Sequence, residues 1–442
     1  MNRFKNVTML ISIFVISFTA IFSGMTFKAE AAEDTLGLDA EASVLVDAET
    51  GRVLYEKNPD VVLGVASMAK MMTEYLVLEA VHNGKISWEQ PVKINEYVHK
   101  LSAAPGLSNV GLTQGEDYTV KELYEAMAIH SGNAAAVALA EVVAGSEKNF
   151  VEEMNKKAEE LNLGEYKFVN STGLNNSSLL GNHPAGAPDE ENVMSARATA
   201  KLAFHLLNDY PEVLETAKIP RLKFRDGREY PNFNWMLPTL VHHYEGVDGL
   251  KTGSTDFAGY SFTATAIRDG QRFISVVMKT NSANERFNET EKVLNYAFSS
   301  FSEEEILPAG YQAEGKKTIA VNKGKEDTVK IESKDPLTMV IKNGEKENYT
   351  TELVIDEDKL DKNGELTAPV NEGDVVGYLT VKTKEGESLS FLTEQGEKAA
   401  QVDVIASESV EKANGFVLMM RGIGGFFGDI WGSASSAIKE LF

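Results

Sequence analysis

The feature that most constrains the fold is a long apolar run that follows residue 67. Residues 71–80 contain neither glycine nor proline, and apolar side chains recur at about every third or fourth position. This spacing predicts a buried α-helix that begins near Ser67. Residues 42–47 and 52–56, which precede it, are β-rich and are joined by a turn that ends in glycine, so they predict a β-hairpin. The chain therefore passes from a sheet into a buried helix close to Ser67.

Ser67 and Lys70 lie three residues apart at this helix start and share one face of the helix. A hydroxyl beside an amine that burial partly deprotonates is an activated nucleophile, and a helix N-terminus would stabilise the resulting oxyanion. The alternative is structural, because serine is a favoured N-cap and a lysine at this spacing is usually solvated. The same Ser-x-x-Lys spacing recurs at Ser409 and Ser436. The spacing alone therefore does not identify a catalytic site.

Composition narrows the class of protein. With 442 residues, of which 43% are hydrophobic, the chain has room for two or three globular domains. The net charge of -23 argues against a nucleic-acid partner, because phosphate binding depends on clustered Lys and Arg. The chain has no cysteine, which excludes a disulfide framework and a thiolate metal site. His242 and His243 lack the spacing of further metal ligands, so no metal and no cofactor are expected.

The N-terminal residues are typical of an export signal. A short basic start at Arg3 and Lys5 precedes an apolar stretch at 7–22, and small residues at 29–31 offer a cleavage site. The alternative is an uncleaved membrane anchor. Either way, the body of the protein is expected outside the cytoplasm.

Two further patterns place polar side chains beside predicted secondary structure. Helical patterns at 121–130 and 134–143 flank Ser131 and Asn133, which would either point into a cleft or cap the second helix. The decoy Ser282-Ala283-Asn284 matches the same pattern. Further helices are predicted at 150–163, 194–207 and 211–217, and a long surface loop of the kind that is often functional at 175–192.

The third pattern, Lys251-Thr252-Gly253, precedes two strands at 260–266 and 273–278 that an Asp-Gly turn joins into a hairpin. Lys251 would supply a cation for a substrate carboxylate and Thr252 a hydroxyl. Gly253 would let a ligand approach the backbone closely. The alternative is an ordinary lysine on an edge strand.

The C-terminal third differs in composition. Past Pro308, short β-rich runs predict a small all-β domain that acts as a spacer or docking module, with strands at 318–321, 328–331, 337–341, 350–355, 375–381 and 389–391. Apolar residues then recur at helical spacing along 410–442. Arg421, Asp429 and several glycines make this a poor transmembrane span, so an amphipathic helix in the membrane interface is expected. The alternative is a helix packed on its own protein or on a dimer partner.

Taken together and in this order, the three motifs resemble those of the penicillin-recognising serine enzymes, with Gly132 where that set has Asp. The other matches, at Ser282, Ser409 and Ser436, all follow the third motif and so do not occur in this order. Within that superfamily, residues 66–73, 170–174 and 248–253 are similar to stretches of the low-molecular-weight D-alanyl-D-alanine carboxypeptidases, the penicillin-binding protein 5 type. Ser254 departs from the many relatives that carry His or Thr there, which leaves fine substrate preference open.

The resemblance implies a fold and a division of the chain. The fold is an α/β (α+β) serine transpeptidase domain with an antiparallel sheet flanked by helices, followed by a small all-β domain and an amphipathic helix. The expected division is a signal peptide at 1–31, the peptidase domain at 32–307, the all-β domain at 308–405 and the membrane-anchoring helix at 406–442.

The resemblance also implies a reaction, a two-step acyl transfer in which the serine attacks the carbonyl between two terminal D-alanines and water later hydrolyses the ester. β-Lactams would be trapped at that ester, and activity should fall at acid pH because a lysine base must be deprotonated. The implied partners are peptidoglycan stem peptides ending in D-Ala-D-Ala, β-lactam antibiotics and the outer face of the cytoplasmic membrane. The implied catalytic residues are Ser67, Lys70, Ser131 and Asn133, and the implied substrate-binding residues are Lys251, Thr252, Gly253 and Ser254.

Three other functions compete with this interpretation. A class A β-lactamase shares the motifs, but no Glu-x-x-Leu-Asn segment between Asn133 and Lys251 supplies its deacylating base. A penicillin-sensing receptor would need a signalling partner and true spanning helices. A histidine-based triad at His130 and Ser131 lacks a Gly-x-Ser-x-Gly elbow.

Overall fold

The computed structural model describes residues 34–386, 388–416 and 418–420. The predicted signal peptide at 1–31 lies outside the described residues. Within the described ranges, no helix is long and apolar enough to cross a membrane.

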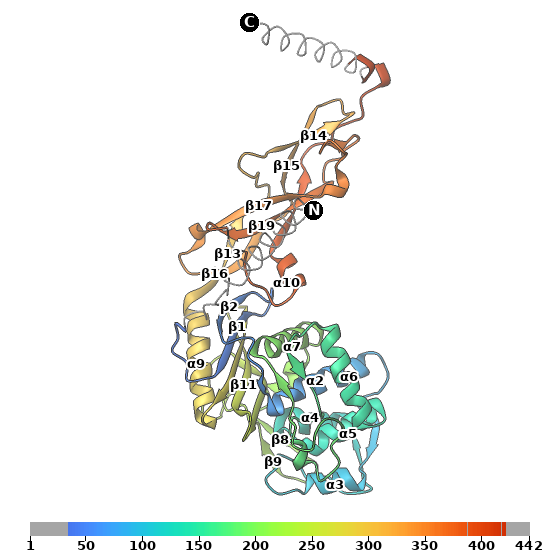
Figure 1. Cartoon of the computed structure of the whole chain (residues 1–442), viewed down its shortest axis with the longest axis vertical. Coiled ribbons are helices and arrows are strands. Elements are labelled where there is room, and N and C mark those ends of the chain that lie inside the picture. Colours follow the sequence, from blue (N-terminus) through green and yellow to red (C-terminus); the bar gives the residue numbers. More distant parts are fainter. Residues whose placement is uncertain (1–33, 387, 417, 421–442) are drawn as a thin grey trace, which may run out of the picture. The chain divides into compact units, whose positions relative to one another are not determined.

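The part of the chain expected to be the peptidase domain is built on a five-stranded antiparallel sheet with the order β10-β11-β12-β1-β2 (Figure 1). Both predicted hairpins are confirmed, and both lie in this one sheet. Its strands are β1 (Ala42–Asp47), β2 (Val53–Lys57), β10 (Val247–Thr255), β11 (Gly259–Arg268) and β12 (Gln271–Thr280). Strand β1 pairs with β12, so a strand from the start of the chain is joined to strands some two hundred residues later.

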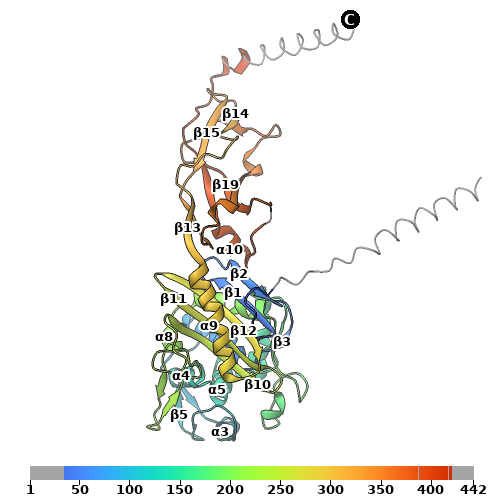
Figure 2. The same cartoon turned by 90° about the vertical axis from the view of Figure 1, so that its left-hand side faces the viewer.

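Helices cover both faces of this sheet, because alternate side chains of each strand point to opposite faces. Phe273 and Val277 of β12 pack with α9 (Ala283–Ser300), which crosses β11 and β12 in Figure 2. Ile274 and Val276 face the other way, into the core of the remaining helices. The predicted antiparallel sheet flanked by helices is thus confirmed.

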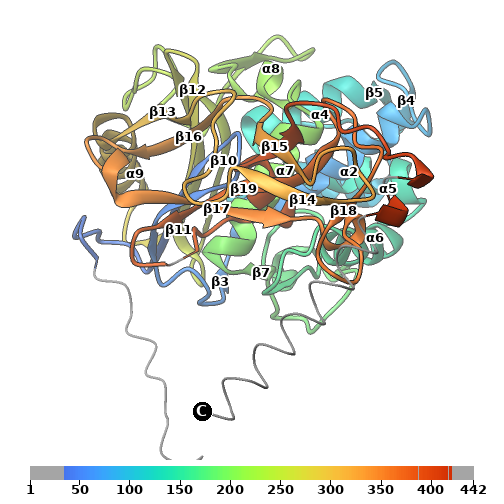
Figure 3. The ribbon, with the colours of Figure 1, turned by 90° about the horizontal axis from the view of Figure 1, so that it is seen from above.

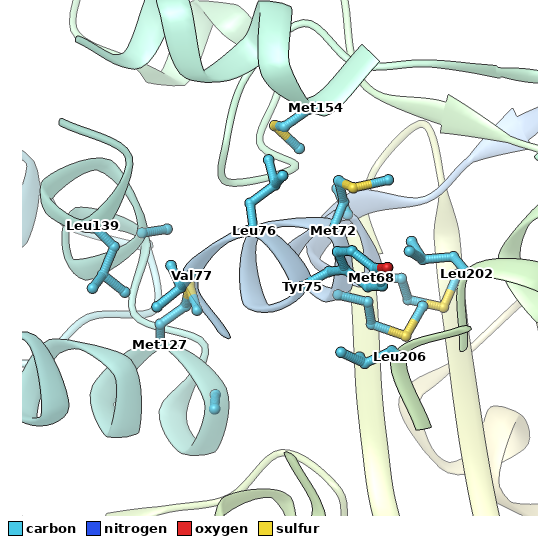
Figure 4. Packing of buried hydrophobic residues seen from close by; sticks show 14 of the residues in the cluster. Met68, Met72, Tyr75, Leu76, Val77, Met127, Leu139, Met154, Leu202 and Leu206 are labelled. Atoms are coloured by element: carbon cyan, nitrogen blue, oxygen red, sulfur yellow. The ribbon is translucent and has the colours of Figure 1, made fainter. Parts of the chain in front are cut away.

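The helical side contains the predicted buried helix at its centre. Figure 4 shows Leu76 of α2 (Lys70–His82) facing Met154 and Val77 facing Leu139. The other predicted helices are confirmed within a few residues at each end. They are α4 (Val120–His130), α5 (Asn133–Ala144), α6 (Glu147–Glu160), α7 (Ala196–Asp209) and α8 (Val213–Ala217), with α3 (Glu96–Ser102) in addition.

The start of the central helix differs from the prediction. Ser67 lies in a short 3₁₀ turn, η1 (Ala66–Ala69), and the α-helix itself begins at Lys70. No side chain caps either element, so the structural alternative for Ser67, an N-cap serine, is wrong. Ala66 enters the turn with φ +45°. The tight turn leaves Ser67 half-buried, while the helix that follows is buried.

The C-terminal part is all-β, as predicted. A six-stranded sheet has the order β17-β19-β20-β15-β14-β18, and Figure 3 shows several of its strands from above. Its strands are β14 (Thr318–Asn322), β15 (Thr328–Ser333), β17 (Tyr349–Ile355), β18 (Leu366–Thr367), β19 (Val375–Thr383) and β20 (Gln401–Ala406), with the short helix α10 (Glu394–Ala399) before β20. A separate pair joins β13 (Phe301–Leu307) to β16 (Leu337–Lys342), so all-β pairing begins before the predicted boundary at 308.

Two predictions for this part are wrong. Residues 389–391 form no strand: one isolated bridge is made by Phe391 within the segment and another by Ser388 just before it. The predicted helix from residue 406 is also wrong over 406–412, because Val410 pairs with Val370 and is buried in the β core. Helical residues begin at Gly415, and residues 421–442, where the rest of the predicted anchor falls, lie outside the described residues.

Candidate active site

Lys70 is the centre of the site. Its Nζ donates to Oγ of Ser67 at 2.9 Å and to Oδ1 of Asn133 at 2.8 Å. A third bond runs to the carbonyl oxygen of Thr172 at 2.5 Å. The amine is thereby held against the hydroxyl that it would deprotonate, which is the geometry of a nucleophile and its base.

The surroundings of Lys70 favour the neutral amine. The side chain is fully buried. Burial, and then the positive charge of Lys251, hold the pKa of Lys70 well below its usual value, whereas the carboxylate of Glu74 opposes this shift. A lysine with a lowered pKa is available as a proton acceptor near neutral pH.

The second motif lies at the junction of two helices. Ser131 ends α4 in the left-handed region with φ 56°, and Asn133 is the first residue of α5. The Asn133 amide is fixed from both sides, because its Nδ2 donates to the Ser108 carbonyl at 2.9 Å while its Oδ1 accepts from Lys70. The simple capping alternative is wrong, since no side chain caps α5.

The third motif approaches the second from strand β10. Nζ of Lys251 donates to Oγ of Ser131 at 3.0 Å, so the two lysines each hold one serine. Burial lowers the pKa of Lys251 to about 8, and the charge of Glu74 acts in the opposite direction. Strand β10 is an edge strand of the sheet, but this lysine is 3% exposed and points inward.

Gly253, which lines the cavity described below, also has a structural role that the sequence pattern did not indicate. A Cβ at this position would lie 2.4 Å from the carbonyl oxygen of Val65. Glycine is therefore needed because β10 passes directly beside the segment that leads into η1, and this contact holds the third motif against Ser67.

A small cavity of about 140 Å³ opens over these groups. Six of the eight predicted site residues line it, and Lys70 and Lys251 lie behind them as hydrogen-bond partners. The lining residues are Ser67, Gly106, Leu107, Ser108, Ser131, Asn133, Leu174, Phe233, Thr252, Gly253, Ser254 and Arg286.

Two residues of the site carry no role in the sequence-based prediction. Thr172 presents its carbonyl to Lys70 from a loop that the Asn170 side chain holds through the Thr172 amide at 3.1 Å and the Gly173 amide at 2.8 Å. Arg286, at the start of α9, is 4% exposed and donates to the Gly253 carbonyl at 3.3 Å. Backbone carbonyls and a lone arginine leave no sequence pattern, so neither could be found before the fold was known.

The decoys lie elsewhere. Ser282 caps α9 by accepting from the Glu285 amide at 3.1 Å, and Ser409 accepts from the Glu372 amide at 2.9 Å. Ser436 lies outside the described residues. Within the described part of the chain, no group of three or more His, Cys, Asp or Glu side chains is placed to hold a metal ion.

The histidine-based alternative also lacks geometry. Nδ1 of His130 lies 2.8 Å from the Pro231 carbonyl, and its ring stacks on Phe233. Ser131 instead accepts from Lys251. The hydroxyl of Ser131 is thus paired with a lysine.

Comparisons with known proteins show which family the chain belongs to. Residues 27–282 match the family described as D-alanyl-D-alanine carboxypeptidase, and residues 301–412 match the C-terminal domain of penicillin-binding protein 5. D-alanyl-D-alanine carboxypeptidase DacF of Bacillus subtilis is 33% identical over 94% of this chain and 96% of its own length.

Solved structures give the same result. A peptidoglycan synthesis regulatory factor (PBP3) from Streptococcus pneumoniae has a TM-score of 0.69 at 34% identity, over 84% of this chain and 99% of that one. Penicillin-binding protein D2 of Listeria monocytogenes in its ampicillin-bound form has a TM-score of 0.51 at 34% identity, over 60% and 99%. With relatives of this identity along almost its whole length, the chain belongs to the D-alanyl-D-alanine carboxypeptidase family of serine peptidases.

Proposed function

We propose that Ser67 is the nucleophile with which this D-Ala-D-Ala carboxypeptidase removes the terminal D-alanine from peptidoglycan pentapeptides. The observation that carries the proposal is the position of the Lys70 amine, 2.9 Å from the Ser67 hydroxyl and held by two further acceptors. A neutral Lys70 has two N–H bonds, which Asn133 and Thr172 accept, so its lone pair then faces the Ser67 hydroxyl and accepts that proton.

Acylation follows from these contacts. Oγ of Ser67 bonds to the carbonyl carbon between the two D-alanines while its proton passes to Nζ of Lys70. The carbon–nitrogen bond then breaks, and the departing amine takes a proton from the Ser131 hydroxyl, which accepts from Lys251 at 3.0 Å. The proton that Lys70 took from Ser67 then passes to Ser131, so both side chains return to their starting states. Asn133, fixed by Ser108 and Lys70, positions the substrate amide. An ester on Ser67 and free D-alanine result.

Deacylation repeats the same steps with water in place of the leaving amine. Water loses a proton to Nζ of Lys70 and attacks the ester carbon, and the departing Oγ of Ser67 takes that proton back and leaves as the alcohol. A β-lactam forms the same ester, but its leaving group stays tethered to the acyl part. This is the chemical basis for covalent inhibition by penicillins.

Substrate binding rests on buried cations at the end of β10. Lys251 lies behind Thr252 and Gly253, and Arg286 lies beside Gly253, so two positive charges converge where the terminal carboxylate would bind. Ser254 is exposed at the mouth of the same cavity, where a hydroxyl would contact the substrate. Buried cations with directed hydrogen bonds bind carboxylates strongly.

Mass spectrometry after incubation with a D-Ala-D-Ala peptide tests the proposal. We expect release of one D-alanine by the wild-type chain and none by Ser67→Ala, with both proteins unfolding at the same temperature. Ser282→Ala is the matched control and should keep normal turnover. A persistent adduct without turnover would favour the penicillin-sensing receptor, and rapid penicillin hydrolysis without peptide turnover would favour the β-lactamase.

The proposed location is the outer face of the cytoplasmic membrane, reached by export through residues 1–31 and held by the C-terminal segment. Where the described chain ends, Phe416, Met419 and Met420 are 68%, 55% and 51% exposed. Exposed apolar side chains at helical spacing favour insertion into the membrane interface.

Vesicle co-sedimentation tests the anchor. A chain that ends at Asn414 keeps Val410 in the β core and should stay in the supernatant with full activity, whereas the full mature chain should pellet with lipid vesicles. Equal pelleting of both forms would contradict the proposed anchor and leave the proposed nucleophile untouched.

A further inference from the structure

Glu74 is a buried carboxylic acid that the proposed mechanism does not use. It lies on α2, four residues after Lys70, so the two side chains occupy neighbouring positions on one face of the helix. The residue is 4% exposed. A carboxylate is costly to bury unless positive charge lies nearby, so its presence under the active site needs a physical reason.

The electrostatic partners of Glu74 are the two lysines of the site. Burial raises the pKa of Glu74 to about 7, while the charges of Lys251 and then of Lys70 act to lower it. In return, the negative charge of Glu74 raises the pKa of both lysines against the effect of their burial. One carboxyl therefore acts on the base and on the carboxylate-binding cation at the same time.

The other elements around α2 bring one further ionisable group to this carboxyl. From α4, the phenol of Tyr124 is 3% exposed, and burial followed by the charge of Glu74 holds its pKa well above the usual value. The charged side chains that reach α2 from α6 and α7 bind elsewhere on it: Lys157 bonds to Glu79 at 2.8 Å, and Asp209 accepts from Tyr75 at 2.8 Å. From β10, the charge of Lys251 acts on Glu74, and Asn133 of α5 is neutral.

The two lysines have opposite requirements. Lys70 must be neutral to accept the proton of Ser67, and Lys251 must be charged to bind a carboxylate and to depress the pKa of Lys70. Arg286 adds a third buried cation that lowers the pKa of Lys251. Without a negative charge nearby, three crowded cations would favour loss of the Lys251 proton as well.

We propose that Glu74 is a positioning residue for the acyl transfer, whose buried carboxylate keeps the positive charge on Lys251 and so leaves Lys70 as the lysine that gives up its proton. The effect is exerted through the two lysines, and Glu74 itself does not touch the substrate. This inference rests on the proposed roles of Lys70 and Lys251.

The experiment is the pH profile of acylation by a fluorescent penicillin, measured with the full mature chain. Glu74→Gln removes the negative charge and should lower the pKa of both lysines. The alkaline limb, along which Glu74 is ionised in the wild type, should then move to lower pH by about one unit, which makes acylation about tenfold slower than wild type on that limb. The Michaelis constant for a D-Ala-D-Ala peptide should rise there more than the turnover number falls.

Two controls separate a charge effect from a structural one. Glu74→Asp keeps the charge and should keep the profile close to that of the wild type. Glu79→Gln removes a carboxylate from the same helix, where it binds Lys157, and should leave both limbs in place. A merely structural role would lower the unfolding temperature of Glu74→Gln without moving either limb.

Each outcome of these measurements either supports or overturns the proposed role of Glu74. An active Glu74→Gln enzyme with an unshifted profile overturns the proposal. If Glu74→Gln does not fold, Glu74→Met, which also removes the charge, carries the same expectation. If no neutral variant folds, the carboxylate is needed for the structure and the proposal is overturned too. Loss of turnover in Ser67→Ala tests the nucleophile independently, so failure of one proposal is distinguishable from failure of the other.

Discussion

The peptidase part and the all-β part treat charge in opposite ways. Beneath the cleft, the peptidase part buries Lys70, Glu74, Lys251 and Arg286 at no more than 4% exposure each. Between Phe301 and the end of the described residues, the buried polar side chains reduce to a single one that is uncharged, Ser333. Both parts have a large apolar core, so the difference does not come from size or from hydrophobicity.

This difference in buried charge shows that the proposed active site costs folding free energy. Removing a charge from water is unfavourable unless partners replace the lost hydration. The strands of the all-β part avoid the cost by alternation, as in β15, where Val329 and Ile331 are buried and Lys330 is exposed. The peptidase part accepts the cost at several places: Asp47, Arg52, Glu147, Glu191 and Glu289 are buried as well. The group beside Ser67 differs from these because it gathers three cations, Lys70, Lys251 and Arg286, with one carboxyl, Glu74. This excess of buried positive charge distinguishes the proposed active site.

The largest expected effect comes from removing the base. Lys70→Ala should slow acylation by at least about 10³-fold, because the hydroxyl of Ser67 loses its proton acceptor. Lys70→Arg should slow acylation to a similar extent, because a guanidinium keeps its proton at the pH of the assay and cannot accept another. Stopped-flow acylation with a fluorescent penicillin measures both, with Lys157→Ala on α6 as a control that should acylate normally. Normal turnover of Lys70→Ala would show that Lys70 is not the base and that the buried charges near Ser67 are not needed for the reaction.

The next effect concerns substrate binding. Lys251→Met should raise the Michaelis constant for a D-Ala-D-Ala peptide by about 10²-fold, the equivalent of losing a buried charged hydrogen bond. A peptide whose terminal carboxylate is an amide should be a poor substrate for the wild type, and the variant should no longer discriminate against it. Lys223→Met, at a side chain that is 84% exposed, is the matched control. A variant that still prefers the free acid would show that Arg286 alone binds the carboxylate.

A smaller effect is expected from pH. The lowered pKa of Lys70 keeps the amine neutral until acid protonates it, so acylation should fall as pH decreases through that value. Lys251, with a pKa of about 8, should lose its proton above that pH, so a second fall is expected on the alkaline side. Each limb should approach about tenfold per pH unit. A rate constant that stays flat from pH 5 to 10 would contradict the proposed titrating groups.

The smallest effect on catalysis is expected from the all-β part. Ile341 is fully buried in its core, and Ile341→Ala should destabilise that part by about 2–5 kcal/mol. Hydrogen–deuterium exchange of the β16 segment measures this loss. The acylation rate per folded molecule should not change, because no catalytic group lies there. A slower rate would show that the all-β part contributes to the active site, which would contradict the division of roles between the two parts.

Much of this organisation could be predicted from the sequence. Local periodicity predicts the hairpin at 42–56, the helix pair around Ser131 and the β-rich C-terminal third. These predictions hold because each spacing of apolar residues matches the buried face of one kind of secondary structure. The predictions that failed also rested on a local pattern, which pairing between distant segments overrode. Val410 reads as part of a helical stripe, but it pairs with Val370 across the β core, and pairing between distant segments is not encoded in the spacing of one of them.

The sequence by itself determined which side chains are available for the chemistry and the order in which they occur: Ser67 with Lys70, then Ser131 with Asn133, then Lys251. Only the tertiary structure decided that they meet. It brings Lys251 of β10 to Ser131, and it presents the carbonyl of Thr172 to Lys70. It also places Arg286 in the wall of the cavity and Glu74 where the charges of both lysines act on it. The physical reason is that proton affinity depends on burial and on neighbouring charge, and both are properties of the folded chain.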